Sequence, residues 1–126
     1  MPSDLARKLF YRGGPAVVLG APPGYGLGVE TVRADAAPLA FALAFVTTTG
    51  ALRQTVWPLL ANTVADPVVW VTYPKVGSGV PSDLNRDVLR GLVEAETAFG
   101  VVTNVAVDAT WSALRLRPKA RIKRRA

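Results

Sequence analysis

The loop at residues 74–81 carries the residue types of an anion-binding site. Lys75 and Ser78 lie in this glycine-rich loop, and Ser82 follows where a helix is expected to begin. Free backbone N–H groups at a helix start, next to a lysine, favour a phosphate or carboxylate group. The Gly-Lys-Ser/Thr of a P-loop is missing at this helix start. A flexible loop in which Ser82 is only an N-cap is the simpler interpretation of the same residues.

A second glycine-rich loop, residues 20–28, offers Gly24 and Tyr25 as further candidate ligand-binding residues. This loop follows a predicted strand, as Lys75 does. Ligands of open α/β sheets bind beyond the carboxyl ends of the strands. If the two strands are adjacent and parallel, Tyr25 and Lys75 face one cleft. The alternative is that the two prolines of the loop form a rigid turn that only closes the sheet.

The composition restricts catalytic chemistry, because the sequence contains neither histidine nor cysteine. Disulfides, thiolate nucleophiles and cysteine-ligated zinc are excluded, and so is the side chain that titrates near neutral pH. Asp108 begins a predicted turn, where an aspartate commonly accepts a hydrogen bond from the backbone two residues on. General acid–base chemistry would need a partner that the sequence does not identify. We therefore expect no catalytic residue, no metal site and no cofactor.

The positive charge is concentrated at the carboxyl end of the chain. The formal net charge is +6, but seven of the 15 basic residues follow Asp108 and no acidic residue does. The preceding chain is close to neutral, with 8 basic and 9 acidic residues. A basic tail can bind the phosphates of a nucleic acid, or it can simply be a solvated end. The candidate phosphate contacts are Arg121, Lys123, Arg124 and Arg125.

The sequence predicts no membrane partner and a cytoplasmic location. The longest apolar run, residues 36–46, has 11 residues and includes Pro38, whereas a membrane-spanning helix needs about 20. This run therefore predicts a buried strand. The first residues lack the charged start and apolar core of a signal peptide.

Hydrophobic periodicity and capping residues predict the secondary structure. The helix at residues 50–65 contains Pro58, which must kink it or delay its start. The helix that begins at Ser82 has an expected buried stripe of Leu84, Val88, Leu92, Ala95 and Phe99, with Gly100 as its end. The other predicted elements are a short capped helix after Ser3, strands at residues 16–19, 29–32, 41–47 and 68–73, and a hairpin of residues 101–107 and 111–116.

Strand–helix–strand units predict parallel neighbouring strands. The expected fold is therefore α/β and Rossmann-like. It has a mostly parallel sheet of about five to six strands, a C-terminal antiparallel hairpin and helices on the faces of the sheet. We expect residues 1–117 to form one domain and residues 118–126 to form a basic tail.

Two segments carry a resemblance to known proteins. One is Tyr73-Pro74-Lys75 followed by Asp83-Leu84-Asn85-Arg86-Asp87, and the other is Val107-Asp108 with residues 110–115, Thr-Trp-Ser-Ala-Leu-Arg. Over residues 5–118 the chain resembles a small bacterial family known only as a domain of unknown function, which implies no activity. The layout is similar to the later half of Rossmann-like methyltransferases, which implies S-adenosylmethionine binding. The expected glycine pattern, however, is interrupted by prolines after the first strand.

These observations favour a non-catalytic domain that binds a small anionic ligand or assists another protein. The first alternative is a nucleic-acid-associated protein that acts through the basic tail. The second is an S-adenosylmethionine-dependent methyltransferase, which the interrupted glycine loop disfavours. Neither a specific ligand nor an oligomeric state follows from the sequence.

Overall fold

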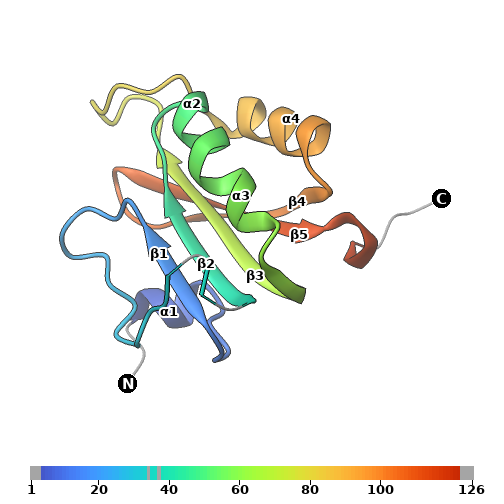
Figure 1. Ribbon diagram of the computed structural model, residues 1–126. Helices are drawn as coiled ribbons and strands as arrows, with labels where there is room; N and C mark the ends of the chain where they lie inside the picture. The colour runs from blue at the N-terminus through green and yellow to red at the C-terminus, as the bar shows by residue number, and fades with distance from the viewer. Residues whose placement is uncertain (1–3, 34, 37, 123–126) are drawn as a thin grey trace.

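The protein is an α/β domain built on one five-stranded mixed sheet (Figure 1). The computed structural model describes residues 4–33, 35–36 and 38–122. β1, β2 and β3 pair in parallel, whereas β5 pairs antiparallel with both β3 and β4. In spatial order the strands are β1 (Ala16–Leu19), β2 (Leu39–Phe45), β3 (Thr63–Pro74), β5 (Trp111–Pro118) and β4 (Phe99–Ala106).

The expected Rossmann-like architecture is wrong. Only two of the four neighbouring strand pairs are parallel, because β5 inserts between β3 and β4. The helix on one face, α1 (Asp4–Lys8), has only five residues, and no helix joins β1 to β2 in the described part of that connection. The predicted strand at residues 29–32 is also absent. The Val32 N–H donates to the Ala16 carbonyl at 2.8 Å, and this bond ties the segment to the edge of the sheet.

The helical segment between β2 and β3 is interrupted, as Pro58 predicts. It runs through α2 (Thr49–Ala51), a π-helical turn η1 (Leu52–Val56) and α3 (Trp57–Leu60). Proline has no N–H to donate to the residue one turn earlier. The hydrogen bonds before Pro58 therefore follow the i→i+5 pattern of a π-helix instead of the i→i+4 pattern of an α-helix. The segment ends earlier than predicted because β3 begins at Thr63, which pairs with Leu39 of β2.

β3 is the central strand and is buried on both faces from Val68 onward. Val69 and Val71 face α2–α3 and α4, whereas Val68 and Trp70 face α1. Figure 1 shows this division, with α1 on one side of the sheet and α2, α3 and α4 on the other. The two faces therefore have separate hydrophobic cores that share β3.

Trp70 attaches α1 to its face of the sheet. Its side chain is fully buried, and its indole Nε1 donates a 2.7 Å hydrogen bond to the Leu9 carbonyl. The next residue, Phe10, has a left-handed φ of 61°, which is uncommon outside glycine and costs backbone energy. The Phe10 ring stacks on Trp70 at a centroid distance of 6.2 Å. The indole thus fixes both the helix and the turn that follows it.

α4 (Arg86–Glu96) begins later than predicted. Its N-cap is Asn85, whose side-chain oxygen accepts from the Val88 N–H at 2.9 Å, so Ser82 is not the cap. The buried residues of α4 itself are Leu89 and Val93, while the predicted Leu84, which is buried just before the helix, and the partly buried Leu92 pack in the same core. Val88 is 37% exposed and Ala95 is also exposed, while Phe99 and Gly100 belong to β4.

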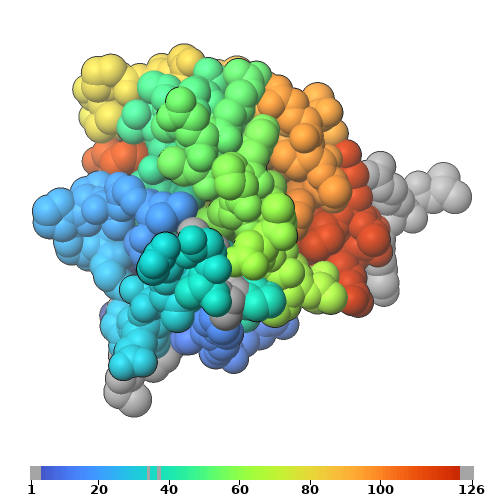
Figure 2. All heavy atoms as spheres, in the orientation of Figure 1, coloured from blue at the N-terminus to red at the C-terminus, as the bar shows by residue number. Residues whose placement is uncertain are grey.

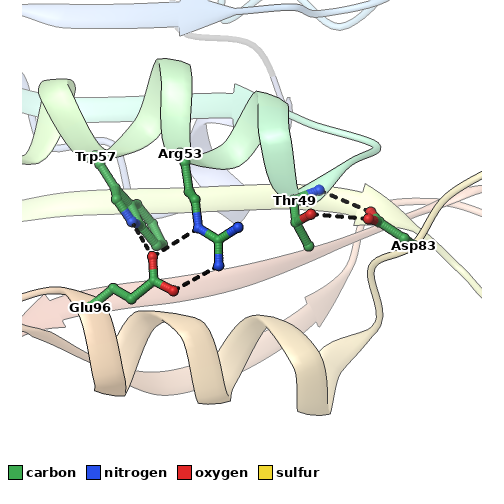
Figure 3. Close-up of polar contacts among 5 residues, drawn as sticks. All are labelled: Thr49, Arg53, Trp57, Asp83 and Glu96. Carbon is green, nitrogen blue, oxygen red and sulfur yellow. Dashed lines mark hydrogen bonds and ion pairs between the residues drawn. The ribbon is translucent and has the colours of Figure 1, made fainter.

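A carboxylate joins α4 to the interrupted helical segment (Figure 3). Glu96 accepts two hydrogen bonds from Arg53, at 2.9 and 2.8 Å, and one from the Trp57 indole at 3.0 Å. These donors lower the pKa of the Glu96 carboxyl to about 2, first through Arg53 and then through Trp57. Figure 2 shows the two helical segments, green and orange, side by side on the surface of the molecule. The contact fixes α4 relative to the rest of the fold.

The folded chain continues past β5 into η2 (Lys119–Arg121). The Lys119 ammonium donates to the carbonyls of Glu94 and Thr97, at 2.8 and 3.0 Å. Lys123, Arg124 and Arg125 lie outside the described residues, as does Ser3. Among the described residues, no helix is long and apolar enough to cross a membrane.

Replacing Thr72 with valine is expected to stabilise the protein. Thr72 is fully buried in β3, and its hydroxyl has no hydrogen-bond partner among the described residues. A methyl group of the same shape removes this desolvation cost, so we expect Thr72→Val to raise the free energy of unfolding by about 1 kcal/mol in urea titrations. The control is Thr97→Val, because the Thr97 hydroxyl donates to the Val93 carbonyl at 2.7 Å. That variant should be destabilised, and a destabilised Thr72→Val would contradict the prediction.

The Glu96 contact predicts a specific loss of stability in acid. A carboxyl group with a lowered pKa stabilises the fold above its unfolded pKa, and this stabilisation disappears as the pH falls through its folded value. The melting temperature of Glu96→Gln should therefore lie below that of the unmodified protein at neutral pH. This gap should close as the pH falls from 4.5 to about 2. Glu30→Gln, at an exposed loop residue, should show no such gap, and a gap for Glu96→Gln that persists at low pH would contradict the prediction.

Candidate functional site

The candidate site is a pocket of about 560 Å³ beyond the carboxyl end of β3, on the α4 face of the sheet. It is formed by strands β3, β4 and β5, the loop after β3, and the start of α4. The lining residues are Tyr73, Lys75, Val76, Asn85, Arg86, Asp87, Val88, Asn104 and Ser112.

The floor of the pocket is polar, although it lies on the core face of the sheet. Tyr73 of β3 and Ser112 of β5 are directly opposite one another in the register, and both are more than nine-tenths buried. The Ser112 hydroxyl donates to the side-chain oxygen of Asn104 at 2.8 Å. Tyr73 is 5% exposed, and among the described residues its hydroxyl has no hydrogen-bond partner. The pocket therefore contains an unused hydrogen-bonding group on a largely buried side chain.

The rim of the pocket is positively charged. Lys75 and Arg86 supply two cations and Asp87 one anion, so the side chains of the lining carry a net charge of +1, and the N-terminus of α4 adds a partial positive charge. The backbone N–H groups of Arg86 and Asp87 are the first of the helix, so they have no intrahelical acceptor. Asp87 is the one carboxylate of the lining, and it lies 3.5 Å from the Arg86 guanidinium. Hydrogen-bond donors thus outnumber acceptors around this pocket.

The segment that leads into α4 is held by the start of α2. The Ser82 hydroxyl donates to the Thr47 carbonyl at 2.6 Å and accepts from the Leu84 N–H at 3.0 Å. Asp83 accepts from both the N–H and the hydroxyl of Thr49, at 2.9 and 3.0 Å (Figure 3). Together with the Glu96 contact, these bonds position the first turn of α4 over the polar floor.

The residues predicted from the 74–81 loop are only partly brought together. Lys75 lines the pocket. Ser78 lies away from it, in a turn where its hydroxyl accepts from the Val80 N–H at 3.4 Å. Ser82 is occupied by its contacts with Thr47 and Leu84, because it ties the loop to α2 instead of capping α4.

Gly24 and Tyr25 line a different and smaller pocket, of about 260 Å³. β1 and β3 are parallel, but β2 lies between them, so the two loops do not face one cleft. Tyr25 packs with the α1-side core, whereas Lys75 opens onto the α4 side. The Tyr25 hydroxyl donates to the Asp108 carboxylate. This bond is the first cause of a raised Tyr25 pKa and a lowered Asp108 pKa.

Asp108 has the turn role predicted for it. One carboxylate oxygen accepts from the N–H groups of Thr110 and Trp111, both at 2.9 Å. The Lys75 N–H donates to the Thr110 carbonyl at 2.8 Å. The turn between β4 and β5 therefore anchors both glycine-rich loops, each on its own side of the sheet.

A larger pocket of about 760 Å³ lies between β1 and the interrupted helical segment. Aliphatic side chains such as Val17 and Leu59 form much of its wall. Its charged residues, Arg33 and Asp35, pair with each other at 3.1 Å. This pocket has space for a ligand, but its charges already neutralise one another, so it gives little indication of what would bind.

Sequence reasoning did not assign Arg86 to the rim of the site, and it missed the floor residues Tyr73, Asn104 and Ser112. The available signal was the appearance of polar residues inside apolar strands, such as Asn104 in a run of valines. That signal becomes interpretable only when the strand register shows that these side chains share one face.

Neither metal-binding side chains nor similarity to known proteins assigns a function to this pocket. Among the described residues, no group of three or more acidic side chains is placed to hold a metal ion. Comparison of the chain with protein-family models, with curated proteins and with solved structures finds no match.

Proposed function

We propose that this domain binds a small molecule that carries a phosphate or carboxylate group, in the pocket between β3, β5 and α4. The observation that carries the proposal is the hydroxyl of Tyr73, which lines the pocket on a 5% exposed side chain and has no partner among the described residues. Because this hydroxyl reaches the pocket and is not committed to another side chain, it can bond with a ligand there without breaking an existing contact. A ligand oxygen would satisfy it.

The charge of the lining supports an anionic ligand. Lys75 and Arg86 are the cations, Asp87 is the carboxylate, and the α4 N-terminus adds a partial positive charge. In this proposal Lys75 and Arg86 neutralise the anion, and the first N–H groups of α4 bind its oxygens. The Tyr73 hydroxyl, on the floor of the pocket, donates a hydrogen bond to another oxygen of the ligand. The Ser112–Asn104 hydrogen bond holds the floor in shape.

Binding is proposed here, and catalysis is not. The pocket supplies hydrogen-bond donors and fixed positive charge, which recognise a ligand without changing it. The sequence has neither histidine nor cysteine, and the carboxylate of the lining lies beside Arg86. Ser78, Ser82, Gly24 and Tyr25 have no part in this site.

Titration with inorganic phosphate, followed by ¹H–¹⁵N NMR, tests the proposal. Saturable shifts are expected first at the amides of Arg86 and Asp87. Tyr73→Phe removes one hydrogen bond to a charged group, so we expect it to weaken binding by roughly tenfold or more. Lys75→Gln should weaken it as well, because it removes one of the two cations.

The matched controls lie on the other face of the sheet. Tyr11→Phe removes a hydroxyl that bonds to the Gly14 carbonyl, and Lys8→Gln removes an exposed cation of α1. Both should bind phosphate as the unmodified protein does. Unchanged binding by Tyr73→Phe and Lys75→Gln, or shifts spread evenly over all basic residues, would refute the proposed site.

A further inference from the structure

Four arginines surround a single carboxylate on the α1 face of the sheet. Arg117 forms two hydrogen bonds with Asp66, both at 3.1 Å. Arg12 and Arg121 are close enough for their charges to lower the pKa of the Asp66 carboxyl further. Arg115 lies two residues before Arg117 on the same strand, and therefore on the same face. One negative charge thus faces four positive charges contributed by three separate parts of the chain.

Arg115 is the cation of this cluster that no carboxylate pairs with directly among the described residues, because Asp66 is bonded to Arg117 and acts on Arg115 only at a distance. It forms no hydrogen bond or ion pair with any described residue, and its Nε atom is buried without a partner. Burial lowers the pKa of Arg115, and the nearby charges of Arg117 and Arg12 lower it further. A guanidinium group has five N–H donors, so this side chain retains unused capacity to bind an anion.

The neighbour of Arg115 is an exposed aromatic ring. The centre of the Arg115 guanidinium lies 5.9 Å from the Phe10 ring centroid, and Trp70, the register partner of Arg115, stacks on the same ring. Phe10 is 51% exposed, even though its backbone holds a left-handed φ of 61°. A large apolar side chain in a strained turn is therefore presented to solvent beside a cluster of positive charge.

We propose that this face, the Arg115 surface, binds single-stranded nucleic acid. It consists of Phe10, Arg12, Arg115, Arg117 and Arg121. The guanidinium groups contact the phosphates, and an unpaired base stacks on Phe10. Guanidinium groups match phosphate geometry bidentately, and aromatic side chains bind bases of any sequence through their faces.

Two further observations favour this occupant. The neighbouring strand β4 leaves the face open, because Thr103, the register partner of Arg115, is exposed. Beyond Arg121 the sequence continues with Lys123, Arg124 and Arg125, so positive charge extends along the chain from this surface. The phosphate pocket proposed above lies on the opposite face of the sheet. The two sites can therefore be tested separately.

Fluorescence anisotropy with labelled single strands of about 15 nucleotides, oligo-rU and oligo-dT, tests this inference. Phe10→Asn removes the ring but keeps a residue that tolerates a left-handed φ. It should weaken binding by roughly tenfold. Arg115→Gln should also weaken binding, and it should reduce the slope of log affinity against log salt by about 0.7.

The controls separate the surface from general charge and from the tail. Arg90→Gln removes an exposed cation of α4 and should retain nearly full affinity. In a chain that ends at Ile122, the effect of Phe10→Asn should persist. Melting curves verify that each variant is folded, and if Arg115→Gln is not, Phe10→Asn alone decides.

Three results would overturn the inference. The first is no binding of either oligonucleotide at low salt. The second is binding that depends on residues 123–126 but is unaffected by Phe10→Asn. The third is binding to anionic lipid vesicles that is as tight as binding to the oligonucleotides and is unaffected by Phe10→Asn. Lipid headgroups offer no base to stack on the Phe10 ring, so such binding would depend on charge alone.

Discussion

The hydrogen bond from the Trp70 indole to the Leu9 carbonyl is the contact on which one whole face of this domain depends. α1 has only five residues, too few to be stable alone, so tertiary contacts must hold it. The same indole supports the Phe10 ring, which in turn lies beside Arg115. Without Trp70, both the cover of this face and the exposed stack above it would lose their support.

β5 connects the two proposed sites because its side chains alternate between the faces of the sheet. Ser112 lies opposite Tyr73 on the α4 face, and Arg115 lies opposite Trp70 on the α1 face. One strand therefore contributes to a polar pocket on one side and to a cationic surface on the other. Its position between β3 and β4 also gives these side chains neighbours on two strands, so both sites are assembled around it.

Local patterns predicted the local structure well. The hairpin of β4 and β5 and the interruption at Pro58 both follow from nearby residues. The N-cap of α4 was misplaced because the Ser82 hydroxyl bonds instead to the Thr47 carbonyl, 35 residues away. The insertion of β5 beside β3 and the convergence of Arg12, Asp66 and Arg115 are contacts between distant parts of the chain. No single-segment pattern encodes them, so the floor of the pocket and the Arg115 surface emerged only from the structure.

The central position of β5 also affects how the chain can reach its native state. β3 acquires its second neighbour only when residues 111–118 dock, some forty residues later in the chain. Until then, the backbone groups along one side of an apolar strand are unpaired, and such an edge can pair with another molecule. Ribosomal synthesis proceeds from the amino terminus, so this interval occurs in every newly made copy. A protein built this way benefits from rapid closure after release, or from a chaperone that shields the open edge.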